Sequence, residues 1–391
     1  MSELPAAEWT RRDGLARLVA ALGAEHVRYV GGAVRDTLLG VDAKDIDCAT
    51  THLPDLVIAR CAAAGIRTVP TGIEHGTVTA VLPDGPVEVT TLRRDVATDG
   101  RRATVAFASE WRDDAARRDF TINALYADPV ALEISDYFGG LDDLAARRVR
   151  FIGDPAQRIA EDHLRILRFF RFQARFGDAP DPDALAACAA LANTLKGLSR
   201  ERVAAELLAL LALPDPVQTV ELMHEAGVLA VILPEATRTQ RETLAQLIEA
   251  ERQANVAPDP IRRLAALLPP LAPTAEALAA RLRLSKQQRS RLICAAERQP
   301  SDAADPRALA YAHGLDCARD RLLLAGESVT GLASWEVPRF PLTGRVVIAR
   351  GVSAGPQVAR LLRMAEDRWV AAGFPDEEAA LHLLDEVMAS A

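Results

Sequence analysis

Short apolar runs separated by Gly, Pro and Asp fill the first part of the chain. Residues 26–30 (HVRYV) alternate as a strand does, and residues 33–39 have the apolar spacing of a short helix that Gly40 ends. Further strands are expected where alternating runs lie between turn residues, at 45–49, 66–70, 76–82 and 86–92, with a hairpin at 122–138. The pattern therefore predicts a mixed α/β domain over residues 1–152.

The pattern changes near residue 154, where the strand signals stop. Beyond it, segments rich in Ala, Leu and Arg are broken by proline-containing turns such as LPDP and APDP, and residues 155–176 have helical apolar spacing. We expect an α+β protein in which a domain with a small mixed sheet is followed by helices alone. The helical part is expected to form three domains, at 153–213, 214–299 and 300–391.

Length and composition are typical of a soluble protein with several domains. A chain of 391 residues is too long for one compact core, and its 49% hydrophobic and 26% charged residues are ordinary values. We expect no membrane span, because no apolar run is long enough, and no signal peptide or protein partner is evident. The five cysteines are scattered without a CxxC pair, which argues for a reducing, cytoplasmic location and against a disulfide framework or a structural zinc.

Charge limits what a basic residue can mean in this chain. The formal net charge is -8, so any binding of nucleic acid must come from a local patch. Only three of the 46 basic residues are lysines, and the others are arginines. A single arginine is therefore weak evidence for a site, and clusters must carry the argument.

The stretch YVGGAVRDTLLGVDAKDIDCAT, residues 29–50, holds the first candidate site. Gly31 and Gly32 lie between an expected strand and an expected helix, where glycine lets backbone N–H groups approach a ligand and the helix N-terminus favours an anion. Arg35 lies in the first turn of that helix. These residues predict a phosphate-binding turn.

Two carboxylates follow the turn. On a strand, Asp45 and Asp47 share one face while Ile46 points to the other, and paired carboxylate oxygens suit Mg²⁺. An Asp-rich turn could arise by chance, but its place after the glycines favours a metal site. The arrangement resembles the nucleotidyltransferase core of the polymerase-β superfamily, in which such carboxylates hold two Mg²⁺ ions. Glu88 is the candidate for a third catalytic carboxylate, with a solvent-facing strand position as an equal alternative.

A second cluster begins at the run RDDAARRDFTINALY and continues into GDPAQRIAEDHLRILRFFRFQARFG. Arg118 and Asp119 offer a donor and an acceptor suited to ribose hydroxyls. Asp162 and Arg165 are three residues apart in a segment expected to be helical, so they are expected to lie on one helical face, with Arg168 continuing the row; Arg168 and Arg171 could reach phosphate oxygens. Asp accepts and Arg donates, so together they could imitate a nucleobase edge and read cytosine or adenine; a solvated helix with surface ion pairs is the alternative.

The chain resembles the class II tRNA nucleotidyltransferases, or CCA-adding enzymes, and the related bacterial poly(A) polymerases. The matching runs fall in family order over about residues 27–210; they are VGGAVRDTLLG, DIDCAT, GIEHGTVTAVL, RRDFTINALY, DPAQRIAEDHLRILRFFRFQARF and LSRERVAAELL. The resemblance implies a polymerase-β-type catalytic head, a helical neck that selects the nucleotide, a body, and a tail that contacts tRNA. Residues 92–107 resemble the flexible loop needed for the final A addition.

The resemblance also implies residue roles. It assigns Mg²⁺ binding to Asp45 and Asp47. It assigns the nucleotide to Gly32, Arg35 and Arg118, the base to Asp162 and Arg165, and the phosphates to Arg168 and Arg171.

We therefore expect template-independent addition of C, C and A to tRNA 3′ ends from CTP and ATP, with release of pyrophosphate. A poly(A) polymerase, or an A-adding or CC-adding specialist, is the alternative within the family, and a non-catalytic RNA-binding module is the alternative from another class. An acidic chain needs local basic residues to bind tRNA. The candidate phosphate contacts, with exposed helix faces as the alternative, are Arg200, Arg202, Lys286, Arg289 and Arg291.

Overall fold

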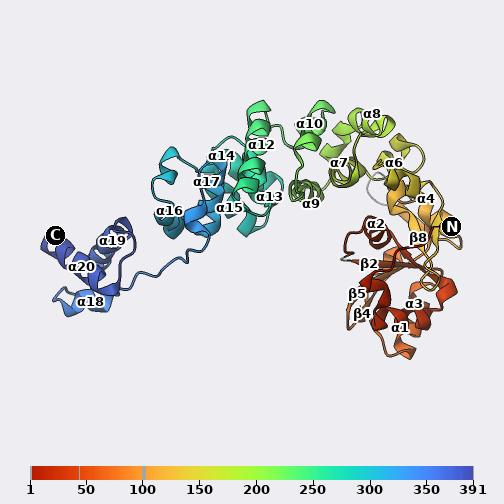
Figure 1. The fold of residues 1–391 in the computed structure, drawn as a ribbon, viewed down its shortest axis with the longest axis horizontal. Helices are drawn as coiled ribbons and strands as arrows, with labels where there is room; N and C mark the ends of the chain where they lie inside the picture. The colour runs from red at the N-terminus through yellow and green to blue at the C-terminus, as the bar shows by residue number, and fades with distance from the viewer. Residues whose placement is uncertain (1, 44, 99–102, 391) are drawn as a thin grey trace. The chain divides into compact units, whose positions relative to one another are not determined.

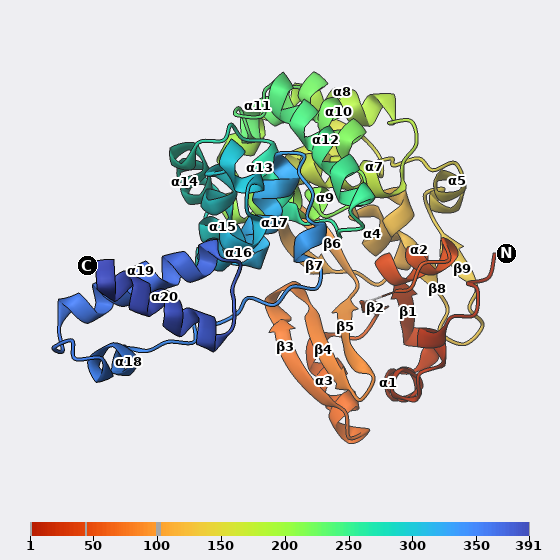
Figure 2. The same cartoon turned by 60° about the vertical axis from the view of Figure 1, so that its left-hand side comes forward.

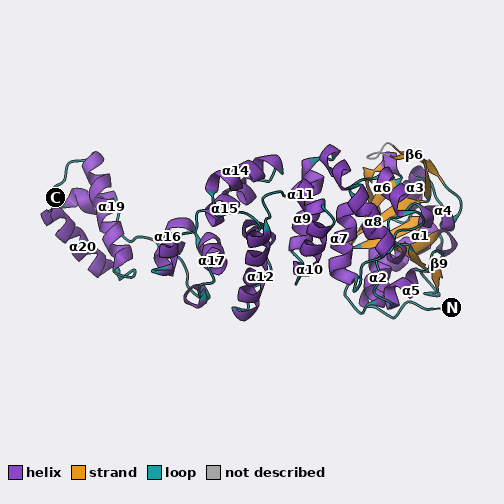
Figure 3. Cartoon of the chain, turned by 90° about the horizontal axis from the view of Figure 1, so that it is seen from above, coloured by secondary structure: helices purple, strands orange, loops and turns teal. Residues whose placement is uncertain are grey.

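The computed structural model describes residues 2–43, 45–98 and 103–390. The chain forms two compact units, Met1–Pro234 and Glu235–Ala391 (Figure 1). All the strands belong to the first unit, and the second is helical (Figure 3). The predicted α+β class is therefore confirmed, whereas the finer division of the helical part into three domains stays a prediction.

A mixed sheet of seven strands forms the centre of the first unit, in the order β3-β4-β5-β2-β1-β8-β9. Only β2 and β5 run parallel; the other neighbours are antiparallel (Figure 2). Their bounds agree with the predicted strands to within two or three residues. They are β1 Val27–Val30, β2 Ile46–Thr50, β3 Arg67–Gly72, β4 Thr77–Leu82, β5 Gly85–Thr91, β8 Leu125–Ala127 and β9 Ile134–Asp136.

A separate two-stranded hairpin, which the sequence did not predict as strands, follows β5. It consists of β6 Arg93–Thr98 and β7 Ala103–Phe107. It occupies most of the segment expected to be a flexible loop, of which residues 99–102 lie outside the described part of the chain.

Eleven α-helices are described in the first unit. They are α1 Asp13–Leu22, α2 Gly32–Leu38, α3 Pro54–Ala63, α4 Trp111–Ala116, α5 Gly140–Ala145, α6 Pro155–Glu161, α7 Arg165–Phe176, α8 Pro182–Ala190, α9 Arg200–Leu211, α10 Val217–Glu225 and α11 Val228–Ile232. Asp154 caps α6 by accepting a hydrogen bond from the Gln157 N–H at 2.7 Å, and Pro155 occupies the first turn, as the sequence predicted.

The second unit contains α12 to α20. They are α12 Arg238–Gln253, α13 Pro260–Ala266, α14 Ala272–Arg281, α15 Lys286–Ala296, α16 Pro306–His313, α17 Leu315–Leu324, α18 Gly344–Ala349, α19 Pro356–Ala371 and α20 Glu377–Ser390. The last three enclose an apolar cluster of their own around Trp369, Leu384 and Val387. Across the described residues, no helix combines the length and apolarity that crossing a membrane requires.

Two of the cysteines form a disulfide, although the sequence argued against a disulfide framework. Cys294 of α15 and Cys317 of α17 form a disulfide, with their Cα atoms 6.0 Å apart, within the usual range for such a bond. Packing of α15 against α17 brings these residues together across a separation of 23 positions, which no spacing rule in the sequence reveals. Cys48, Cys61 and Cys188 are free and buried.

Candidate active site

The glycine turn connects β1 to α2. Gly31 has φ 69° and ψ −126°, and a Cβ atom there would lie 3.2 Å from the Arg118 guanidinium. Both the positive φ and the close approach of Arg118 favour glycine at this position. The turn therefore brings the start of α2 and Arg118 together.

Arg35 of α2 is 5% exposed and held by two neighbours. Its Nε and Nη2 atoms donate to Asp36 Oδ1 at 2.8 and 2.6 Å, and its Nη1 atom donates to Asn123 Oδ1. Burial lowers the pKa of Arg35, and the Asp36 carboxylate acts against that effect. The guanidinium is thus fixed in orientation near the turn.

The three predicted carboxylates lie at one end of the sheet. Ile46 and Cys48 are buried on β2, so Asp47 between them faces the other way, and Asp45 directly precedes the strand. In the parallel pairing of β2 with β5, Asp47 and Glu88 are direct partners. Burial and the charge of Glu88, with a smaller contribution from Asp45, raise the pKa of Asp47, whereas Arg118 lowers it. A bound cation would lower the repulsion between these carboxylates.

Among the residues the structure describes, no three His, Cys, Asp or Glu side chains form a ready-made metal cage. Asp45 and Asp47 nevertheless supply the oxygen ligands that suit Mg²⁺, an ion that usually completes its shell with water and substrate phosphates. The donor set therefore fits a metal that arrives together with a nucleotide.

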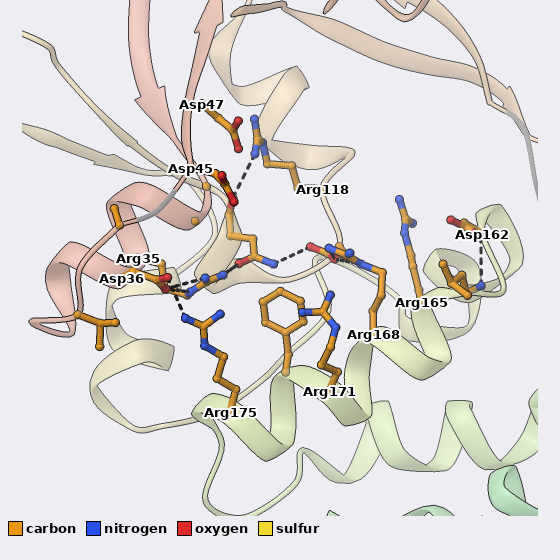
Figure 4. A pocket seen from close by; sticks show the side chains of 18 of the residues that line it. Arg35, Asp36, Asp45, Asp47, Arg118, Asp162, Arg165, Arg168, Arg171 and Arg175 are labelled. Atoms are coloured by element: carbon orange, nitrogen blue, oxygen red, sulfur yellow. Dashed lines mark hydrogen bonds and ion pairs between the residues drawn. The ribbon is translucent and has the colours of Figure 1, made fainter. Parts of the chain in front are cut away.

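A cavity of about 970 Å³, here called the arginine cavity, adjoins these carboxylates. Figure 4 shows Arg118 beside Asp45 and Asp47, and Arg168, Arg171 and Arg175 projecting from α7. Eleven of the twelve predicted site residues line the cavity; they are Gly31, Gly32, Arg35, Asp45, Asp47, Arg118, Asp119, Asp162, Arg165, Arg168 and Arg171. Glu88 is not among the lining residues, although it pairs with Asp47. The lining residues that sequence reasoning missed include Asp36, Arg117, Asn123, Phe172, Arg175 and Arg202.

Two arginines of α7 form ion pairs with carboxylates. Arg168 donates to Asp119 Oδ2 at 2.7 Å, and Arg171 donates to Glu206 Oε2 at 2.6 Å. Burial alone would raise the pKa of Asp119, but Arg168, with hydrogen bonds from Asn123 and the Phe120 N–H, lowers it to about 2. The side chain that the sequence assigned to the ribose is therefore an ionised partner of Arg168.

Asp114 of α4 is a further carboxylate that the sequence did not single out. Its side chain is 1% exposed and accepts hydrogen bonds from Arg117 at 2.8 Å, Arg118 at 3.3 Å and the Tyr126 hydroxyl at 2.6 Å. The Arg93 N–H, at the start of the β6–β7 hairpin, donates to it at 3.3 Å. Asp114 thus links that hairpin to two arginines of the cavity. The run RDDAARRD contains no local signal that separates Asp114 from its exposed neighbour Asp113.

The expectation that Asp162 and Arg165 share one helical face is wrong. Asp162 follows the end of α6 in an extended conformation (φ −148°, ψ 105°), and α7 begins at Arg165. Asp162 Oδ1 accepts from the Leu164 N–H at 3.1 Å, a local turn that competes with helix formation. Both residues still line the arginine cavity, on either side of the break.

Asp162 and Arg165 are positioned by different partners. Asp162 Oδ2 accepts from Arg202 of α9 at 2.6 Å. Arg165 donates to Glu161 at 2.6 Å and to the Arg117 carbonyl at 3.0 Å. The Glu161–Arg165 pair is not a solvated surface pair, since the two side chains are only 11% and 12% exposed.

Comparison with known proteins identifies the family. The Poly A polymerase head domain matches residues 27–150, and the probable RNA and SrmB-binding site of polymerase A matches residues 179–239. The CCA tRNA nucleotidyltransferase 1, mitochondrial, of Homo sapiens is 34% identical over 90% of this chain and 84% of its own length. The chain belongs to the CCA tRNA nucleotidyltransferase family. The resemblance seen in the sequence is therefore confirmed.

Further members of this family and a solved structure agree. A CCA-adding enzyme of Streptococcus gordonii is 40% identical over 57% of this chain and 55% of its own length. The crystal structure of the Bacillus stearothermophilus CCA-adding enzyme in complex with CTP is 27% identical, covers 97% of this chain and 99% of its own, and has a TM-score of 0.77. The CCA tRNA nucleotidyltransferase fold thus extends over nearly the whole chain.

Proposed function

We propose that this chain adds C, C and A to the 3′ ends of tRNA from CTP and ATP and releases pyrophosphate at each step. The observation that carries the proposal is the arginine cavity, which brings the paired carboxylates of the β1–β2 region together with the arginines of α7. Its lining of eight arginines and six aspartates provides both phosphate binding and hydrogen-bond acceptors within one space. Family membership supports the same conclusion.

We propose that Asp45 and Asp47 hold Mg²⁺, with Glu88 supporting Asp47 from the neighbouring strand. When bound, the metal activates the attacking 3′-hydroxyl and offsets charge on the phosphates. Arg35 and Arg118 lie around the glycine turn, where they would bind the triphosphate close to these carboxylates. Binding of the primer and the triphosphate in one fixed geometry lowers the entropic part of the barrier.

Base selection is proposed to rest on Asp162 and Arg165. Arg202 and the Leu164 N–H hold Asp162 in place. A carboxylate only accepts, so it would pair with the exocyclic amine of cytosine or adenine, while Arg165 donates to ring acceptors. Uracil and guanine lack that amine in that position and would leave charged groups without partners. Arg168 and Arg171 would then bind phosphate oxygens, and Asp119 would orient Arg168.

The experiment that tests this function uses three tRNA transcripts, ending at the discriminator base, at C and at CC. Each is incubated with the protein, Mg²⁺ and CTP, ATP or both, and the products are separated on a sequencing gel. Growth to CCA that then stops is the expected result. Long A tails would indicate a poly(A) polymerase, addition of A to the CC-ended transcript alone an A-adding specialist, growth that stops at CC a CC-adding specialist, and no addition a non-catalytic RNA-binding module.

A cytoplasmic location remains a proposal. It rests on the sequence, and the Cys294–Cys317 disulfide argues in the other direction, because disulfides are rare in reducing compartments. Rapid acid quenching of intact cells, followed by alkylation of the thiols under denaturing conditions and mass spectrometry, tests it. Five alkylated cysteines are expected in a reducing cytoplasm, and protection of Cys294 and Cys317 would contradict this location.

A further inference from the structure

Phe172, on α7, lies among three of the arginines that line the arginine cavity. The guanidinium carbons of Arg35, Arg168 and Arg171 lie over its ring, at 5.2, 5.4 and 4.8 Å from the ring centre. Phe172 itself lines the cavity, yet only 5% of its surface is exposed. The ring is therefore covered mostly by the protein, including these three guanidinium groups.

The three arginines carry like charges and come from two elements. Arg35 belongs to α2, whereas Arg168 and Arg171 belong to α7 (Figure 4). The face of an aromatic ring is negative, so it attracts a guanidinium, and the attraction is larger where water is excluded. One nearly buried ring thus attracts cations from both helices and offsets part of their mutual repulsion.

The ring acts on the arginines differently from the carboxylates that pair with them. Glu206 accepts from the Nε atom of Arg171 at 2.6 Å, and Asp119 accepts from the Nε atom of Arg168 at 2.7 Å. Each such carboxylate occupies a donor and offsets the positive charge. A guanidinium can instead stack on an aromatic ring without using its donors. The contact with Phe172 therefore restrains these arginines and leaves their charge and their remaining N–H groups for phosphate oxygens.

Phe169, three residues earlier on α7, provides a matched comparison. It is fully buried, and its ring packs on the rings of Phe120, Phe151 and Phe170. Phe172 packs on Phe120 as well, with ring centres 5.1 Å apart. Both phenylalanines thus contribute to the same aromatic core, but Phe172 also contacts the arginine cluster.

We propose that Phe172 is a positioning residue for the nucleoside triphosphate, holding Arg35, Arg168 and Arg171 in the orientation that binds its phosphates. This inference deepens the proposed function, on which it rests, by assigning triphosphate affinity to an apolar side chain that makes no hydrogen bond to the substrate. Phe172 would serve the phosphates through the arginines, whereas Asp162 would serve the base.

The test measures the dissociation constants of CTP and of cytidine by equilibrium dialysis in the presence of Mg²⁺. Phe172→Leu keeps an apolar side chain without the negative ring face and should weaken CTP binding about fivefold to thirtyfold. Cytidine has no phosphate, so its affinity should stay at the wild-type value. Phe172→Tyr retains the ring and should bind CTP as wild type does. Phe169→Leu removes a ring from the same helix and is the control, with CTP affinity unchanged.

Thermal unfolding shows whether each variant is folded. If Phe172→Leu does not fold, trifluorophenylalanine incorporated at position 172 keeps the shape of the ring and weakens its negative face. It should weaken CTP binding about threefold to tenfold.

Wild-type CTP affinity in a folded Phe172→Leu protein, or in the fluorinated protein, would overturn the proposal, and so would an equal loss in Phe169→Leu. A matching loss of cytidine affinity would show that the ring contacts the nucleoside and would refute the positioning role. Because these measurements do not require chain extension, a wild type that binds CTP without extending tRNA would contradict the proposed function alone.

Discussion

At the scale of single residues, three arginines that line the arginine cavity are each fixed by an ion pair with a carboxylate. Arg168 rests on Asp119, Arg171 on Glu206, and Arg118 on Asp114. Each pair fixes a planar donor group before any phosphate arrives, so less side-chain entropy is lost on binding. Two of these carboxylates, Asp114 and Glu206, do not line the cavity themselves, and short motifs identify such positioning residues poorly.

Asp114→Asn tests this organisation. Its carboxylate accepts from four donors, and an amide oxygen cannot replace it as partner of two guanidinium groups. Hydrogen bonds to charged groups contribute about 1.5–3 kcal/mol, so kcat/KM for CTP should fall about tenfold or more. Steady-state kinetics give this value. The neighbouring Asp113→Asn changes an exposed carboxylate and should have no effect; equal losses in the two variants would contradict the positioning role of Asp114.

Asp45→Asn tests the metal-binding proposal. Replacing one of two ligand carboxylates should lower the rate of nucleotide addition by about a hundredfold or more, because charge stabilisation at the reacting phosphate is lost. Single-turnover addition of CMP at several Mg²⁺ concentrations measures it. Asp55→Asn, an exposed change on α3, is the control. An Asp45→Asn protein with the wild-type rate and Mg²⁺ dependence would refute the assignment.

At the scale of elements, the strands could be predicted because their signals are local. Buried and polar residues alternate along β4 and β5, and Gly and Pro bound them. The break between α6 and α7 was not predicted, because the helical apolar spacing continues through Asp162, whose carboxylate instead accepts from the Leu164 N–H and from Arg202, forty positions away. Among the described residues, β6 and β7 form a two-stranded sheet of their own. Their segment is rich in charged residues and lacks the alternating pattern of a half-buried strand.

The contact between Asp119 and Arg168 of α7 predicts an effect of acid on stability. Because the pKa of Asp119 is lowered to about 2 from 3.8, its ionised form stabilises the fold above about pH 4, and this contribution is lost as the pH falls towards 2. This contribution of ionised Asp119 to the free energy of unfolding amounts to about 2 kcal/mol. Urea unfolding of wild type and Asp119→Asn measures it. The difference in the free energy of unfolding between the two proteins should become smaller as the pH falls from about 4 to 2. A difference that stays constant would contradict the prediction.

At the scale of the whole molecule, the sequence identified the family and eleven of the residues that line the arginine cavity, because these lie in short ordered motifs. It did not identify the disulfide or the partners of the arginines, which depend on contacts between distant helices. The pairing of arginines with carboxylates therefore depends on the tertiary contacts within each unit.

The central claim is that protein side chains, without a template, select the base in the arginine cavity. The most direct test measures kcat/KM for CTP, ATP, UTP and GTP on transcripts ending at the discriminator base and at CC, for wild type, Asp162→Ala and the exposed control Asp183→Ala. We predict that wild type and control prefer the correct nucleotide over UTP and GTP by about a hundredfold or more, and that Asp162→Ala loses most of this preference. Full wild-type preference in an active Asp162→Ala enzyme would contradict the account.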